Sequence, residues 1–99
     1  MYQFNKLEEL LKANGIEYER EDRRGGIDIG PIVYFFHQLR CPNCIGGRYV
    51  WDVIYANGSF GEEDGLLELY GTEMDEPLGY MTAEECLKVI KEKLAKEQE

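Results

Sequence analysis

The segment from residue 51 to residue 86 lacks lysine and arginine altogether, although it carries ten acidic side chains. The rest of the 99-residue chain holds all eleven basic residues against the other ten acidic ones, which gives a net charge of +1 outside the segment. The formal charge of −9 therefore belongs to this one segment. A nucleic-acid-binding surface needs cations to displace counterions from phosphates, so we expect no direct contact of this protein with nucleic acid.

The chain also lacks any run of about 18 apolar residues, the minimum for a membrane-spanning helix. Its first residues do not combine a basic start with an apolar stretch, the pattern of a secretory signal peptide. We therefore expect a cytoplasmic protein with no membrane partner, whose three cysteines are reduced.

Recognisable catalytic and cofactor motifs are missing as well. The only histidine, His37, is not accompanied by a serine or cysteine in any known nucleophile motif. No Gly-Lys-Ser/Thr sequence of a phosphate-binding loop occurs. The sequence therefore predicts a non-enzymatic protein with no catalytic residues and no cofactor, and an enzyme would require an apolar cleft around His37.

What the sequence contains is the composition of a folded domain. Apolar residues make up 43% of the chain and aromatic residues 12%, which is typical of a globular protein. A length of 99 residues is enough for one hydrophobic core but not for two. We therefore expect residues 1–99 to form a single α+β domain.

Capping patterns and apolar spacing predict two helices. The first is expected over residues 5–13, with Asn5 as N-cap and Glu8 completing a capping box. The second is expected to follow Thr82, because Glu85 three positions later completes another capping box. Each helix has an apolar stripe that it cannot bury alone, so both should pack on one face of a sheet.

Alternation of apolar and polar residues predicts the strands of that sheet. The expected strands are residues 16–20, 32–39, 48–56 and 66–70. Asn57-Gly58 is typical of a tight hairpin turn, whereas residues 21–31 and 71–80 are expected to be loops. Short connections favour neighbouring antiparallel strands. The predicted fold is thus a three- to four-stranded antiparallel meander with an N-terminal and a C-terminal helix on one face.

A pair of cysteines, Cys41 and Cys44, frames the turn Cys-Pro-Asn-Cys. This spacing can hold zinc through two thiolates, which makes a small zinc-binding or thiol-bearing module an alternative function. A structural zinc site needs four ligands, however, and the only further cysteine and histidine in the chain are Cys86 and His37. Incidental thiols in a hairpin turn are the other interpretation.

The acidic residues of the 51–86 segment are the candidate partner-binding residues. Those we expect to contribute are Asp52, Glu62, Glu63, Asp64, Glu68, Glu73, Asp75 and Glu76. Neither acidic cluster has the alternating ligands of an EF-hand calcium loop. Solubility alone is one explanation of the charge. Carboxylates on adjacent strands and loops could instead form a negative lattice that attracts a basic protein.

A pattern of turns, core positions and a helix cap runs through the second half of the chain. It consists of Trp51-Asp52, Gly58-Ser59-Phe60-Gly61, Glu63-Asp64-Gly65-Leu66-Leu67-Glu68, Gly71 and Gly79-Tyr80-Met81-Thr82-Ala83-Glu84-Glu85. By this pattern the chain resembles a group of small acidic bacterial proteins from prophages and other mobile elements, most of them uncharacterised. The resemblance implies a setting in which such proteins often antagonise host machinery, including CRISPR nucleases.

The leading functional hypothesis combines the charge pattern with this setting. We expect a non-enzymatic acidic protein-binding module whose partner is a basic protein. The sharpest version is a phage-derived inhibitor that mimics nucleic acid and occupies the basic groove of a nucleic-acid-binding protein such as a CRISPR nuclease.

Overall fold

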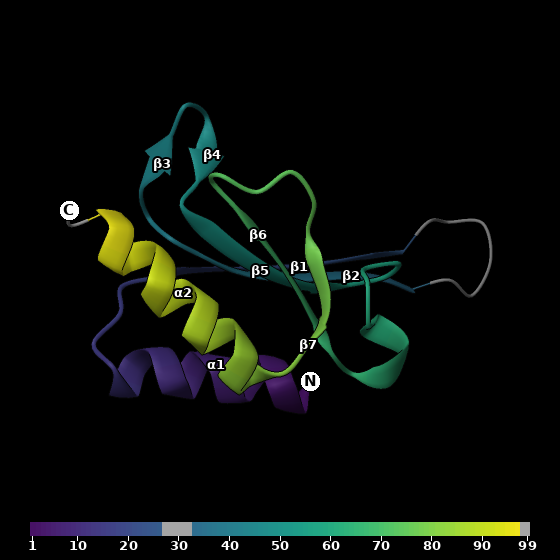
Figure 1. The fold of residues 1–99 in the computed structure, drawn as a ribbon. Helices are drawn as coiled ribbons and strands as arrows, with labels where there is room; N and C mark the ends of the chain where they lie inside the picture. Colours follow the sequence, from purple (N-terminus) through teal and green to yellow (C-terminus); the bar gives the residue numbers. More distant parts are fainter. Residues whose placement is uncertain (27–32, 98–99) are drawn as a thin grey trace.

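The computed structural model describes residues 1–26 and 33–97 and shows two helices beside an antiparallel sheet (Figure 1). The helices are α1 (Tyr2–Ala13) and α2 (Ala83–Glu97). The main sheet has the strand order β1-β2-β5-β6-β7. Its strands are β1 (Glu19–Gly26), β2 (Val33–Arg40), β5 (Trp51–Ala56), β6 (Leu67–Gly71) and β7 (Leu78–Met81). A hairpin of β3 (Cys44–Ile45) and β4 (Arg48–Tyr49) is inserted between β2 and β5, and a short helical turn, η1 (Glu62–Asp64), precedes β6.

The predicted α+β class is confirmed, and the strands of the main sheet follow one another in chain order, as in a meander. Figure 1 shows both helices on the same side of that sheet. The predicted number of strands, three to four, was too low, because the main sheet has five. The structure differs from the predicted strands at two places, the N-terminal edge strand β1 and the strand β7 before α2.

The N-terminal edge strand β1 is longer than its sequence suggested. Residues 21–26, predicted as the start of a loop, pair with β2 in the register Glu21↔Gln38 to Gly26↔Val33. Charged side chains stabilise this edge through cross-strand pairs such as Glu21 with the guanidinium of Arg40 at 3.0 Å. The rest of the predicted loop, residues 27–31, and the first residue of the predicted strand 32–39 lie outside the described residues.

The strand β7 occupies part of the predicted acidic loop 71–80. It pairs with β6 through Leu67↔Met81 and Leu69↔Leu78, with an irregular register between the two pairs. This irregularity hides the strand's alternation in the sequence. The predicted strand 48–56 is instead interrupted at Val50, whose N–H donates to Asn43 O at 3.2 Å.

The first helix begins earlier than predicted. Asn5 is not its N-cap, because the N–H of Asn5 already donates to Met1 O in an ordinary helical hydrogen bond. Glu8 is used elsewhere and accepts hydrogen bonds from Tyr18 and Arg20. The second capping box is confirmed, since Thr82 N donates to Glu85 Oε1 at 3.0 Å and Glu85 N donates to Thr82 Oγ1 at 3.3 Å.

The hydrophobic core lies between the helices and one face of the sheet. Its largest fully buried side chains are Trp51, Phe4, Leu7, Leu11, Leu39, Leu67, Leu69, Ile90, Val53 and Cys86. The two helices also meet each other, and Gln3 Oε1 of α1 accepts a hydrogen bond from the first N–H of α2, at Ala83, at 2.8 Å. Because side chains alternate along a strand, the residues between the core positions face the uncovered side of the sheet.

Within residues 1–26 and 33–97, no helix has the length and apolar character needed to cross a membrane.

Candidate functional site

The eight predicted acidic residues lie in three separate places. Asp52 and Glu68 are on the uncovered face of the sheet, on β5 and β6. Glu62, Glu63 and Asp64 form η1, before β6, and Glu73, Asp75 and Glu76 lie in the connection after it. Five residues of strand span roughly 16 Å, and Figure 1 places the two acidic clusters at opposite ends of β6. One continuous surface therefore does not contain them all.

The carboxylate of Asp52 has a cation beside it that the local sequence does not show. Asp52 is paired in register with Arg40 of β2. The Arg40 guanidinium donates to Glu21 at 3.0 Å and to Glu19 at 3.3 Å, and it also donates to Gln38 Oε1 at 3.0 Å. Gln38 Nε2 in turn donates to Asp52 Oδ2 at 2.9 Å. The uncovered sheet face thus carries a mixed-charge network around Arg40.

Burial sets the ionisation of Asp52. Loss of solvent is the main cause that raises the pKa of this carboxyl, and the nearby carboxylate of Glu68 raises it further. The hydrogen bond from Gln38 and the positive charge of Arg40 lower this pKa in turn. A half-buried carboxyl that accepts a hydrogen bond from Gln38 within the sheet presents little of its surface to a partner. Asp52 is therefore a structural residue of the sheet.

Replacing Asp52 with asparagine is expected to raise the midpoint of thermal unfolding at pH 7 by about 4 °C. Because folding raises the pKa of this carboxyl, its contribution to stability is lost as the pH rises through the folded pKa. Asparagine keeps an oxygen that can accept from Gln38 and carries no charge. The gain should vanish near pH 3.9, about the ordinary pKa of aspartate, because the wild-type carboxyl is protonated there.

Circular dichroism melts of both proteins from about pH 3 to pH 8 would measure this difference. Taking the difference between the two proteins removes the contribution of the carboxyls that both share. A variant less stable than the wild type at pH 7 would show that the charge of Asp52 is needed in the folded state.

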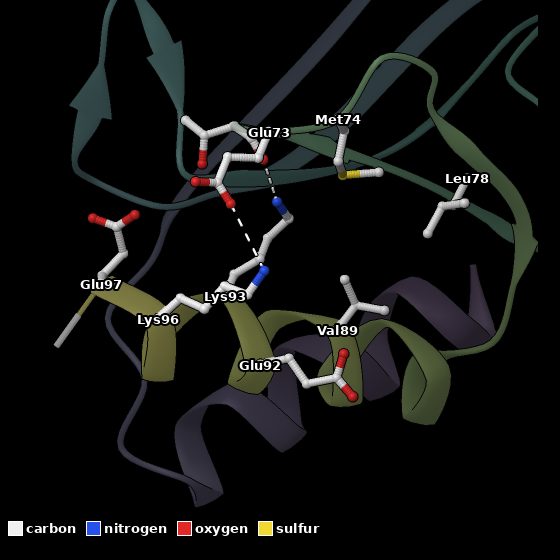
Figure 2. Close-up of a pocket in the computed structure, with 9 residues that line it drawn as sticks. Glu73, Met74, Leu78, Val89, Glu92, Lys93, Lys96 and Glu97 are labelled. Atoms are coloured by element: carbon white, nitrogen blue, oxygen red, sulfur yellow. Dashed lines mark hydrogen bonds and ion pairs between the residues drawn. The ribbon is translucent and has the colours of Figure 1, made fainter. Parts of the chain in front are cut away.

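The acidic cluster after β6 is also accompanied by cations, which come from α2 and β4. Lys96 Nζ lies 3.9 Å from Glu73 Oε2, and Lys93 Nζ donates to the carbonyl of Thr72 (Figure 2). From β4, Arg48 Nη1 donates to Met74 O at 3.3 Å. In this cluster Glu73 therefore has an ion-pair partner, while Lys93 and Arg48 contact backbone carbonyls.

A hollow of about 310 Å³ separates this connection from α2. Figure 2 shows its apolar side chains, Met74, Leu78 and Val89, beside Lys93. Burial lowers the pKa of the Lys93 amine, which is held against the Thr72 carbonyl. These contacts attach the β6–β7 connection to α2.

The third acidic cluster, at η1, is distinguished by the side chains that lie beside it. Of the described residues, no lysine or arginine forms an ion pair with Glu62, Glu63 or Asp64. Beside them stand two large exposed aromatic side chains, Phe60 at 55% exposure and Tyr80 at 61%. These five residues line a hollow of about 300 Å³ with Gly58, Ser59 and Gly61. We name Phe60, Glu62, Glu63, Asp64 and Tyr80 the acidic corner.

A close crossing of two backbone segments builds the acidic corner. Tyr80 N donates to Phe60 O at 3.2 Å. A Cβ at Gly79 would lie 2.3 Å from Phe60 Cβ, and one at Gly61 would lie 2.9 Å from Tyr80 Cα, so neither position has room for a side chain. Tyr80 itself has a φ of 56°, a left-handed conformation that is uncommon outside glycine. Such backbone strain persists only where the surrounding structure holds the residue in place.

The two cysteines of the Cys-Pro-Asn-Cys turn differ in accessibility. Cys44 is exposed at the start of β3, while Cys41 is buried and its pKa is raised mainly by that burial. Burial likewise raises the pKa of Cys86, in the core, to about 12. Throughout residues 1–26 and 33–97, no group of three or more histidine, cysteine or acidic side chains is placed to hold a metal ion. Among those residues, Cys41 and Cys44 therefore have no third side chain with which to hold a metal ion.

Phe60 and Tyr80 were not predicted as site residues from the sequence, where Phe60 was only part of a pattern of turns and core positions and Tyr80 was part of an expected loop. The available signal was that each aromatic residue adjoins a glycine, in Phe60-Gly61 and Gly79-Tyr80. Comparison of the chain with protein-family models, curated proteins and solved structures found no match. The geometry of the acidic corner is therefore the basis for assigning a function.

Proposed function

We propose that this protein is a non-enzymatic binding module whose acidic corner engages a basic segment of another protein. The observation that carries the proposal is the combination of three carboxylates, unpaired among the described residues, with two exposed aromatic rings. Solubility alone explains exposed carboxylates. It does not explain a strained backbone that holds Phe60 and Tyr80 beside them.

The two kinds of side chain would contribute differently to binding. Aromatic residues are enriched at the energetic centres of protein interfaces, because they bury a large area with little loss of side-chain entropy. Tyr80 and Phe60 can also stack on the guanidinium group of an arginine. Glu62, Glu63 and Asp64 would steer a positively charged surface toward these rings and so accelerate association.

A basic nucleic-acid-binding protein is the partner class that we favour. Its groove holds phosphates, and a cluster of carboxylates can take their place. The resemblance to proteins of mobile elements supports an inhibitor of host machinery, with a CRISPR nuclease as one example. The acidic corner alone, and not the entire 51–86 segment, would then act as the mimic of nucleic acid.

Reversing the charge of the acidic corner is expected to slow association about tenfold or more. The variant is the triple substitution Glu62→Lys, Glu63→Lys, Asp64→Lys, assayed by biolayer interferometry against purified basic nucleic-acid-binding proteins, a Cas9-type nuclease among them. Association of the wild type should also slow between about 50 and 300 mM salt. The double substitution Phe60→Ala, Tyr80→Ala should instead act mainly by speeding dissociation.

A matched control lies at the other end of β6. The triple substitution Glu73→Lys, Asp75→Lys, Glu76→Lys changes the net charge by the same amount and should leave the association rate within about threefold of the wild type. Equal losses for both triple variants would mean that overall charge, and not the acidic corner, drives binding. If no protein of the panel binds the wild type at low salt, the proposal fails.

A further inference from the structure

A third hollow, of about 320 Å³, lies away from the acidic clusters, and it surrounds the only histidine. The described residues that line it are Met1, Arg24, Phe35, His37 and Tyr55. It lies on the helix side of the sheet, because the ring centroid of His37 is 5.8 Å from that of Phe4 in α1. An enzyme would require an apolar cleft around His37, and this hollow places the rings of Phe35 and Tyr55 beside that histidine.

The walls of this hollow are flat rings. The Phe35 ring centroid lies 5.5 Å from that of Tyr55 and 5.9 Å from that of His37, with interplanar angles of 34° and 33°. Neighbouring rings with these tilts form a shallow concave aromatic surface. A planar ring could stack against such walls, since offset and tilted aromatic pairs are favourable beyond their apolar area.

One nitrogen of His37 is already used by the protein. His37 Nδ1 lies 2.6 Å from Asp22 Oδ1. The Asp22 carboxyl has its pKa lowered, first by the hydrogen bond from Arg20 and then by His37, so it is ionised and accepts. Nδ1 therefore carries a proton and donates to Asp22, which fixes the orientation of the ring and leaves Nε2 for a ligand.

Arg24 gives the hollow its charge. The other two arginines of β1 have carboxylate partners, Arg20 with Glu8 and Asp22, and Arg23 with Glu21. Among the described residues Arg24 forms no ion pair, although it lies directly across from Phe35 in the β1–β2 register. A guanidinium next to aromatic walls is suited to a ligand that joins a planar ring to an anionic group.

We propose that this hollow binds a small planar aromatic anion, with an aromatic carboxylate as the type of ligand. The ring lies among Phe35, His37 and Tyr55, and the carboxylate pairs with the guanidinium of Arg24. A volume of about 320 Å³ is at the small end of ligand pockets, which limits the ligand to one or two fused rings. The proposal is independent of the partner of the acidic corner.

Titration with 2-naphthoate, followed by two-dimensional NMR of the isotope-labelled full chain, tests this site. We expect saturable shifts at Phe35, His37 and Tyr55 with a Kd below about 1 mM. The neutral analogue 2-naphthamide should bind about tenfold more weakly, because it cannot form the charge-assisted pair with Arg24. The protein's net charge of −9 opposes nonspecific attraction of an anion, so a preference for the anion would report a local cation.

Two neighbouring arginines provide a matched pair of variants. Arg24→Gln should weaken 2-naphthoate about tenfold and remove its advantage over 2-naphthamide. Arg23→Gln removes the same charge from the opposite face of β1, where Arg23 stacks on Phe36, and should change the Kd less than about twofold. Equal effects of the two variants, equal binding of the two ligands, or the absence of saturable shifts at about 10 mM 2-naphthoate would overturn the proposal.

Discussion

Replacing Gly71 with alanine is expected to lower the free energy of unfolding by about 3 kcal/mol. Gly71 is the last residue of β6 and pairs with Trp51 of β5. A Cβ at this position would lie 2.2 Å from Val50 O and 3.0 Å from Trp51 Cα. Both are backbone atoms at the interruption between β4 and β5, so no side-chain rotation can relieve the contact and the strands must separate.

Gly25→Ala is the matched control for this substitution. Gly25 also belongs to a strand of the sheet, but a Cβ there meets nothing within 4 Å among the described atoms. The stability change at Gly25 should stay within about 0.5 kcal/mol. Urea denaturation of both variants, followed by the fluorescence of Trp51, would measure the difference. Similar stabilities of the two variants would show that β5 and β6 adapt to the added methyl group.

Truncating Leu7 to alanine is expected to cost about 3 kcal/mol, because it opens a cavity in the layer between α1 and the sheet. Leu7 is fully buried and belongs to the single core that both helices share. For a domain of this size, such a loss is a large share of the total stability. The same urea titration measures it.

Leu10→Ala provides the comparison within the same helix. Leu10 packs against the core but is only partly buried, so its truncation should cost about 1 kcal/mol. Equal losses at the two positions would mean that α1 is not held by the face that carries Leu7. The Leu7 prediction also requires that the unfolding curve stays cooperative, since an uncoupled α1 would fray before the sheet unfolds.

Local signals predicted those elements whose residues interact with near neighbours. The Thr82–Glu85 capping box joins residues three positions apart, and it was predicted correctly. Asn5 and Glu8 have the same spacing, but Glu8 is taken by Tyr18 and Arg20 from the segment that follows α1. That competing partner is more than one helical turn away, so the capping pattern at Asn5 could not be judged from the sequence.

The distribution of charge shows the same limit for the candidate site. The 51–86 segment lacks cations in the sequence, yet Arg40, Arg48, Lys93 and Lys96 reach its residues through the sheet register and the packing of α2. Only tertiary structure brings these groups together. A sequence window could therefore identify the acidic segment but not which of its residues have a cation nearby among the described residues.

The hydrogen bond from Ala83 N to Gln3 Oε1 has a consequence for how the chain folds during its synthesis. The two residues are 80 positions apart. At a translation rate of about 5–20 residues per second, α2 leaves the ribosome roughly 4–16 s after α1. Until then the apolar stripe of α1 has no helical neighbour, and it must wait on the ribosome for both the strands and α2. Nascent chains of this protein are therefore expected to expose Leu7 and Leu11 to chaperones during this interval.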